Sequence, residues 1–275
     1  MSLDSFIPAI WSETLQRSMN EKYVGVANCT REYEGEIREK GSHVKILDLN
    51  DIGVTDYYPN SDLGSPDDLS GSAQDLYIDR AKCFNFQLDD VEHAQAVPTL
   101  MAAAMDKAAK ALAKEADRAV YAQYVNTSFT LQANGADPDD ILDAFIKTRT
   151  KLLENGVAST DDIVFEISPL VAEKLFKAQI NLTSDNTVLE NGCIGKLAGC
   201  KVYVTNNITK MHSDGVDHHM CFARTRRAIA FAEQLSEIEA YRPETRFADA
   251  VKGLHLYGVK VIYPLEFGVV DVAFE

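Results

Sequence analysis

The chain has 275 residues, 46% of them hydrophobic and 25% charged, which is the composition of a folded protein able to bury a sizeable core. Its formal net charge of −15 argues against nucleic acid as a directly bound partner, because such binding uses clustered Lys and Arg. No apolar run reaches ~18 residues, and the N-terminus lacks the basic start and apolar core of a secretory signal, so we expect neither a membrane span nor export.

The first 40 residues are expected to form an arm that carries one short helix. Residues 8–19 place Ile10, Trp11, Leu15 and Met19 on one helical face. Trp11 is the only tryptophan, and so close to a terminus it either anchors the arm on a partner or fills the core of its own domain. Residues 24–37 alternate between polar and apolar side chains and predict extended structure.

Residues 41–95 predict a strand, a broad loop and a returning strand. Residues 43–50 alternate as a strand does, residues 57–74 are dense in Pro, Gly, Ser, Asn and Asp, and residues 75–91 alternate again. A two-stranded ribbon is marginally stable in water by itself. This ribbon therefore needs a surface, which either its own domain or a neighbouring subunit supplies.

Residues 97–124 predict the longest helix of the chain. They are rich in Ala, Leu, Met, Lys and Glu, which are strong helix formers, and Pro98 falls in the first turn. An Ala-rich apolar stripe lets other elements approach closely, while Asp106, Asp117 and Arg118 are expected on the opposite face. The helix is either an ordinary amphipathic core helix or the spine of an elongated subunit.

The rest of the chain alternates helices and strands. Residues 126–134 predict a strand, and residues 136–157 predict a helix capped by Asp137, with Pro138 in its first turn and Gly156 at its end. Residues 163–167 predict a central strand followed by a helix that begins near Ser168. We therefore expect an α/β sub-domain over residues 136–239 and a strand-rich end over residues 240–275.

Only weak signals of chemistry are present. His212, Asp214, Asp217, His218 and His219 are residue types that bind metals, but their Ser-Asp-Gly context favours a solvated loop. The glycines near Lys196 lack the spacing of a phosphate-binding loop, and no nucleophile elbow or dinucleotide fingerprint occurs. The sequence thus predicts no catalytic residue, no metal and no cofactor.

The cysteines and the basic residues have structural interpretations. Five cysteines without C-x-x-C spacing indicate reduced thiols in a cytosolic protein. Arg224, Arg226 and Arg227 form the most basic spot of the chain. In an acidic protein this spot is better explained by an inter-subunit salt bridge or a strand end than by a phosphate site.

The order of these parts resembles a known family. FIPAIWSETL opens an arm, EYEGEIREKGSHVKI leads into the ribbon, and IGKLAGCKVYVTNNI and RAIAFAEQLSEIEAYRPETRFADAVKGLHLYGVKVIYP follow the long helix in the expected order. Together they resemble the major capsid proteins of tailed bacteriophages, which have the Hong Kong 97 type coat-protein fold. The resemblance covers nearly the whole chain.

The resemblance implies an α+β fold with four parts. Residues 1–40 would be the N-terminal arm and residues 41–95 the extended β-ribbon loop that lies on a neighbour. Residues 96–135 and 240–275 would form the peripheral domain around the spine helix, and residues 136–239 the axial domain. The net charge of −15 suits a lining that must not bind packaged DNA tightly.

The implied function is that of a coat subunit, not an enzyme. Copies of the chain would assemble as pentamers and hexamers into the icosahedral shell of a virion, made in the cytoplasm of a bacterial host and enclosing double-stranded DNA without sequence-specific binding. A separate scaffolding protein, a portal and a decoration protein are implied partners. The inter-subunit contact candidates are Trp11, Tyr57, Tyr58, Lys82, Phe84, Arg224, Arg226 and Arg227.

Two features depart from parts of the family. The arm is expected to start at residue 1, without a cleaved scaffolding segment before it, which implies a separate scaffolding protein or a mature form. Lys45 and Lys82 lie in the ribbon region, but no matching Asn and catalytic Glu can be assigned, so we expect no Lys–Asn crosslink.

Three other interpretations stay open from the sequence. A cellular nanocompartment shell would share this fold and differ in cargo. A cytosolic metal-dependent enzyme would use the histidines between His212 and His219. A tail or connector protein would form rings or tubes instead of closed shells.

Overall fold

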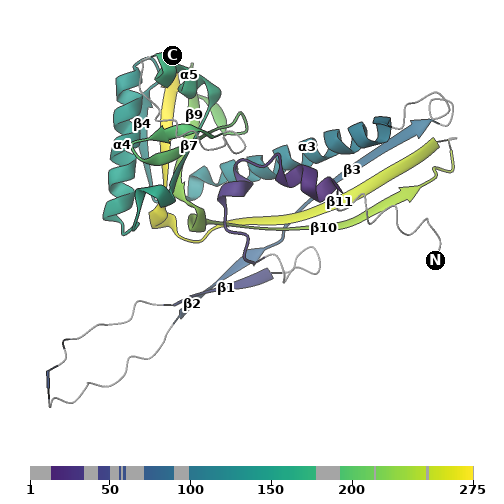
Figure 1. Cartoon of the computed structure of the whole chain (residues 1–275), viewed down its shortest axis with the longest axis horizontal. Coiled ribbons are helices and arrows are strands. Elements are labelled where there is room, and N and C mark those ends of the chain that lie inside the picture. The colour runs from purple at the N-terminus through teal and green to yellow at the C-terminus, as the bar shows by residue number, and fades with distance from the viewer. Residues whose placement is uncertain are drawn as a thin grey trace.

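The structure is a computed structural model that describes residues 14–33, 43–49, 56, 58–59, 71–89, 99–177, 193–213, 215–245 and 248–274. The expected contact residues Trp11 and Tyr57, and Asp214 of the histidine-rich stretch, lie outside these residues. Figure 1 shows a compact α/β body, an elongated body built on a long helix, and a narrow ribbon that projects from the second. No helix in these ranges is both long enough and apolar enough to cross a bilayer.

A seven-stranded sheet forms the compact body, with strand order β4-β12-β9-β5-β7-β6 and β8 paired to β9. The strands are β4 (Phe129–Asn134), β5 (Ile163–Ile167), β6 (Cys193–Leu197), β7 (Cys200–Val204), β8 (Lys210–Ser213), β9 (Val216–Thr225) and β12 (Phe267–Phe274). All five residues of β5 are buried, which confirms the predicted central strand. Parallel pairs (β4 with β12, β5 with β7) and antiparallel pairs occur in the same sheet.

Two helices belong to this body. Helix α4 (Pro138–Glu154) packs on β4, β12 and β9, and α5 (Pro169–Lys177) contacts α4. The predicted start of α4 is confirmed, because the side chain of Asp137 accepts a hydrogen bond from the Asp139 N–H at 3.0 Å. The predicted stop is confirmed as well: Gly156 has φ +100°, a conformation that residues with a Cβ rarely adopt.

A three-stranded antiparallel sheet with order β10-β11-β3 forms the elongated body. Its strands are β3 (Arg80–Asp89), β10 (Ile229–Tyr241) and β11 (Ala248–Val261), and helix α3 (Thr99–Tyr121) runs along them (Figure 1). The predicted long helix is thus confirmed. Its buried stripe consists of Met105, Ala108, Ala109, Leu112, Ala113, Ala116, Ala119, Val120 and Tyr121.

The ribbon consists of β1 (His43–Leu49) and β2 (Gly71–Tyr77), paired antiparallel from His43 opposite Tyr77 to Leu49 opposite Gly71. Its inward side chains pack on the three-stranded sheet in a small cluster of Val44, Ile46, Leu76, Ile78, Ala230, Ala232, Leu256 and Ile262. The close contact requires a glycine, since a Cβ on Gly258 would lie 2.2 Å from the Tyr77 carbonyl oxygen. The base of the ribbon therefore rests on its own subunit.

The returning strand differs from the prediction. Residues 75–91 were expected to be one strand of the ribbon, but the chain breaks at Ile78 and Asp79, and β3 pairs with β11 instead. The cause is packing, because Phe84 and Phe86 of β3 lie against the main hydrophobic core, which the ribbon does not reach.

The N-terminal segment also differs in part. Residues 14–20 are helical and bury Leu15 and Met19, as expected, whereas Val26–Asn28 form a 3-10 helix, η2, where extended structure was predicted. Thr30 then forms a parallel bridge with Ala230 of β10. The other 3-10 helices are η4 (Ala122–Asn126), η5 (Thr160–Asp162), η6 (Arg226–Ala228) and η7 (Pro264–Glu266).

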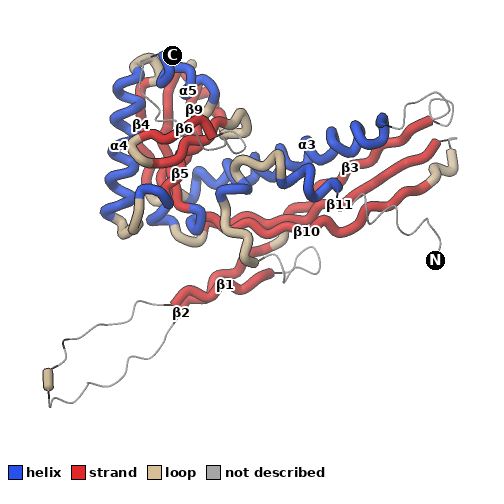
Figure 2. Tube along the Cα trace, viewed as in Figure 1, coloured by secondary structure: helices blue, strands red, loops and turns tan. Residues whose placement is uncertain are grey.

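The strand pairings cut across the expected domain boundaries. Strands β4 and β12, expected with the spine helix, belong to the seven-stranded sheet, while β10, expected mostly in the α/β part, belongs to the three-stranded sheet. Strand β9 continues through η6 into β10, and this is one of the lengths of chain that link the two bodies drawn in Figure 2.

Candidate functional site

The two bodies and the N-terminal segment meet at a buried polar junction around Arg224. This residue is the penultimate residue of β9, just before the chain turns into η6 and β10. Its side chain is fully buried, and so is that of Glu166 on the neighbouring strand β5. Alternation along β9 directs Arg224 inward, while the next turn directs Arg226 and Arg227 outward.

Arg224 uses every one of its N–H donors. Nε and Nη2 donate to the two carboxylate oxygens of Glu166 at 2.9 and 3.0 Å, in the bidentate geometry that suits guanidinium and carboxylate. The remaining donors reach the N-terminal segment: the Asn28 carbonyl at 2.7 Å, the Gly25 carbonyl at 2.8 Å and the Cys29 sulfur at 3.4 Å. The buried charge is therefore fully paired, and it holds η2 in place.

Asp117 of α3 forms the second half of the junction. Its carboxylate accepts hydrogen bonds from the Val24 N–H at 3.2 Å, the Val26 N–H at 3.0 Å and the Asn207 amide at 3.1 Å. Burial raises the pKa of Asp117 to about 6, although these hydrogen bonds act in the opposite direction. The prediction that Asp117 lies on the exposed helix face is wrong, because backbone N–H groups of the N-terminal segment bind its carboxylate in place of water.

A second buried cluster ties the same segment to the three-stranded sheet. Glu233 of β10 accepts hydrogen bonds from Tyr23 at 2.5 Å, from Arg31 at 2.5 Å and from His255 of β11 at 2.8 Å. Burial alone would raise the pKa of Glu233, but His255 and Arg31 hold it below its usual value. The N-terminal segment is thus bound by buried charge to both bodies of the subunit.

The interpretation of Arg224 as an inter-subunit contact is corrected by its burial. A side chain with no exposed surface, whose donors are all used within its own subunit, has nothing left to offer a neighbour. The sequence does contain a signal for the burial of Arg224. It follows the apolar run Met220–Ala223 within one strand, whereas the next charged residues come after that strand has ended. What the sequence could not supply was Glu166, which lies 58 residues away in the chain.

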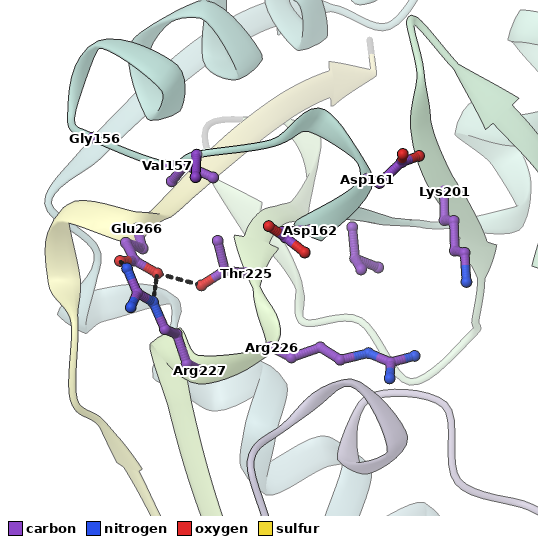
Figure 3. A pocket seen from close by; sticks show the side chains of 11 residues that line it. Gly156, Val157, Asp161, Asp162, Lys201, Thr225, Arg226, Arg227 and Glu266 are labelled. Carbon is purple, nitrogen blue, oxygen red and sulfur yellow. Dashed lines mark hydrogen bonds and ion pairs between the residues drawn. The ribbon is translucent and has the colours of Figure 1, made fainter.

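Arg226 and Arg227 line an open hollow of about 490 Å³ below the seven-stranded sheet (Figure 3). Arg227 is bound to Glu266 of η7, which also accepts a hydrogen bond from Thr225 at 2.5 Å. On the other side, Asp161 is paired with Lys196 at 3.2 Å. Arg226 and Lys201 extend into the same hollow, and within the described ranges neither forms a hydrogen bond or an ion pair.

The histidine-rich stretch forms a β8–β9 hairpin instead of a solvated loop, with Gly215 at φ +85° in its turn. Its histidines have separate partners: His212 pairs with Asp217 at 2.7 Å, His218 with Asp271 at 2.9 Å, and His219 with Ser168 at 2.7 Å. Burial lowers the pKa of His219. No group of three metal-binding side chains comes together anywhere in the described part of the chain. Each of the three histidines instead has its own partner within the subunit.

The remaining contact candidates lie on the elongated body and the ribbon. Lys82 is half exposed and pairs with Glu115 of α3 at 3.0 Å. Phe84 is partly buried beside Gly253, and Tyr58 is 66% exposed. None of these positions is brought next to Arg226 by the fold, so the sequence-derived candidates do not form a single site.

Comparison with solved structures identifies the architecture. A structure of Mycobacterium phage Che8 matches with a TM-score of 0.68 and 28% identity, covering 90% of this chain and 90% of that chain. The capsid structure of cyanophage P-SCSP1u matches with a TM-score of 0.67 and 15% identity, covering 92% and 90%. A virus-like particle from Pyrococcus furiosus matches with a TM-score of 0.58 and 15% identity, covering 96% and 99%. The sequence matches no protein-family model and no curated protein.

The ribbon base, the spine helix and the seven-stranded α/β body have the fold of phage capsid structures, and the matches over nine tenths of each chain confirm the predicted Hong Kong 97 type fold. The chain is thus similar in fold to the major capsid proteins of tailed bacteriophages, as the resemblance in its sequence predicted.

Proposed function

We propose that copies of this chain form the icosahedral shell that encloses the double-stranded DNA of a tailed bacteriophage. The observation that carries the proposal is the match in fold to phage capsid structures over nine tenths of the chain. An acidic subunit supports the same function, since a net charge of −15 repels packaged DNA instead of binding it. No catalytic step forms part of this function.

The parts of the subunit have separate roles in the proposal. The seven-stranded body with α4 and α5 is the axial domain around five-fold and six-fold positions. The three-stranded sheet with α3 is the peripheral domain. The sheet pairings support boundaries that assign β4 and β12 to the axial domain and β3 and β10 to the peripheral domain. The ribbon beyond its base and the arm before residue 14 extend over neighbouring subunits.

The proposal includes further partners and a site of synthesis. The subunits are made in the host cytoplasm and assemble with a separate scaffolding protein, around a portal, and a decoration protein binds the finished shell. The contacts proposed between copies include Tyr58 on the ribbon and Lys82 and Phe84 at the start of the peripheral sheet, together with Trp11 and Tyr57.

Electron microscopy of the protein, expressed alone and together with its genomic neighbours, tests the proposal. Closed shells of uniform diameter are expected, either from the chain alone or with a scaffolding neighbour. Rings or tubes would indicate a tail or connector protein. Compact monomers under every condition would contradict the proposal.

A nanocompartment shell is the second candidate, favoured only by the match to the archaeal virus-like particle. The contents of the purified particles separate the two candidates: double-stranded DNA in particles from a phage lysate supports the coat protein, and a packaged protein cargo supports the nanocompartment.

A further inference from the structure

The hollow drawn in Figure 3 contains a pair of positive charges that the subunit leaves unused. Arg226 extends from η6 and Lys201 from β7, and the two side chains point toward one another across the hollow. Neither is bound by an acid within the described part of the chain, although their neighbours Arg227 and Lys196 each have a carboxylate partner. The chain has 42 acidic and 27 basic residues, so a second copy offers many carboxylates to two unpaired cations.

The acids around the hollow do not neutralise these cations. Glu266 is occupied by Arg227 and Thr225, and Asp161 by Lys196. Asp162 also lines the hollow and is unpaired within the described ranges, so the free groups are Arg226, Lys201 and one carboxylate. The site therefore has an excess of positive charge and room for an additional acidic group.

An exposed apolar residue directly precedes Glu266, which lines the hollow. The 3-10 helix η7, which supplies Glu266, exposes 61% of its central residue, Leu265. The position of Leu265 is fixed from behind, since its carbonyl oxygen accepts a hydrogen bond from the Asn155 side chain at 2.8 Å. Covering an exposed leucine removes apolar surface from water, so a partner bound at the hollow would also gain from contact with Leu265.

We propose that this hollow binds an acidic side chain of a second copy of the chain, with Arg226 and Lys201 on the carboxylate and Leu265 against the neighbouring surface. The inference rests on the proposed function, and it assigns one copy-to-copy contact of the shell. A second copy fits because its surface is acidic overall. A nucleic-acid backbone fits poorly, because Asp161, Asp162 and Glu266 would face successive phosphates and only two cations are free.

Charge reversal tests the contact. Arg226→Glu and Lys201→Glu place a negative charge against the incoming carboxylate, and the concentration needed for shell assembly should rise about tenfold or more, as it does when a close interfacial charge pair is broken. Lys177→Glu is the control for the change of charge, since Lys177 is an exposed lysine that pairs only with Glu173 of its own helix. Arg226 is exposed, so the melting temperature of unassembled subunits should stay that of the control.

Several results would overturn the inference. Wild-type shells together with unchanged assembly of both variants would refute the contact and leave the coat function intact. Unchanged assembly with weaker retention of DNA by the Arg226→Glu shells would assign the hollow to nucleic acid. If Arg226→Glu fails to fold, two other measurements test the contact. Arg226→Gln should also need a higher concentration for shell assembly, and the wild-type protein should lose assembly at high salt. Wild-type protein that stays monomeric in sedimentation under every condition would refute the contact and the coat function together.

Discussion

Replacement of Arg224 by methionine tests the idea that buried charge holds the N-terminal segment to the rest of the subunit. Methionine fills a similar part of the space but removes all five donors. Glu166 would keep only the hydrogen bond from the Asn28 amide at 3.0 Å, and the Asn28 carbonyl would lose its donor. The Gly25 carbonyl would keep the Asn28 N–H at 3.2 Å and the Cys29 thiol at 3.3 Å.

The expected cost follows from this geometry. Leaving one member of a fully buried ion pair without its partner costs about 3–5 kcal/mol, a large share of the roughly 5–15 kcal/mol that stabilises a domain. Arg118→Met is the matched control, because Arg118 and its partner Glu115 are 54% and 37% exposed, and losing this pair should cost only about 0–1 kcal/mol. The double variant Arg224→Met with Glu166→Met should cost less than the sum of the single variants, by about 1–3 kcal/mol.

The assay is chemical unfolding of unassembled subunits, followed by limited proteolysis of residues 14–33. We expect lower midpoints and faster cleavage for Arg224→Met, and neither effect for Arg118→Met. Equal costs for the two arginine variants, or strictly additive single variants at Arg224 and Glu166, would refute the reasoning.

Three other predictions concern single positions. Gly258→Ala should lose about 1–3 kcal/mol in thermal unfolding, because its Cβ would meet the Tyr77 carbonyl oxygen, and a stability equal to wild type would show that the ribbon base does not rest there. Since burial raises the folded-state pKa of Asp117 to about 6, this residue stabilises the fold below about pH 4 and loses that contribution as the pH rises through 6. The unfolding free energy of Asp117→Asn should therefore fall less than that of the wild type as the pH rises from about 4 through 6. The same pH dependence in both proteins would contradict the raised pKa of Asp117. Burial raises the pKa of the Cys29 and Cys200 thiols to about 11 and that of Cys221 to about 12, so a thiol reagent at pH 8 should modify exposed Cys83 first in mass spectrometry, and early labelling of Cys221 would contradict its burial.

The parts of the fold that follow local rules could be predicted from the sequence. Helix α4 was predicted with its cap at Asp137 and its stop at Gly156, because both signals lie within a few residues of the ends that they define. Strand β5 and the Ala-rich helix α3 were predicted for the same reason, since periodicity and composition alone determine them.

The parts that depend on distant partners could not be predicted. Asp117 looks like a surface residue on a helical wheel, and only distant donors make its burial favourable: the backbone of Val24 and Val26, more than 90 residues earlier, and the Asn207 amide, 90 residues later. Strand β3 continues the alternation of β2, so nothing local separates the ribbon from the sheet. For the candidate site, the basic stretch was recognised, but the sequence could not show that Arg224 pairs with Glu166 while Arg226 stays free.

The most direct test of the coat function is an icosahedral cryo-electron microscopy reconstruction of the particles. We expect one subunit of this fold repeated over a closed shell, with the ribbon of each subunit continuing from its base at β1 and β2 onto the adjacent subunit. Absence of closed particles, or a ribbon that contacts only its own subunit throughout the shell, would contradict the account.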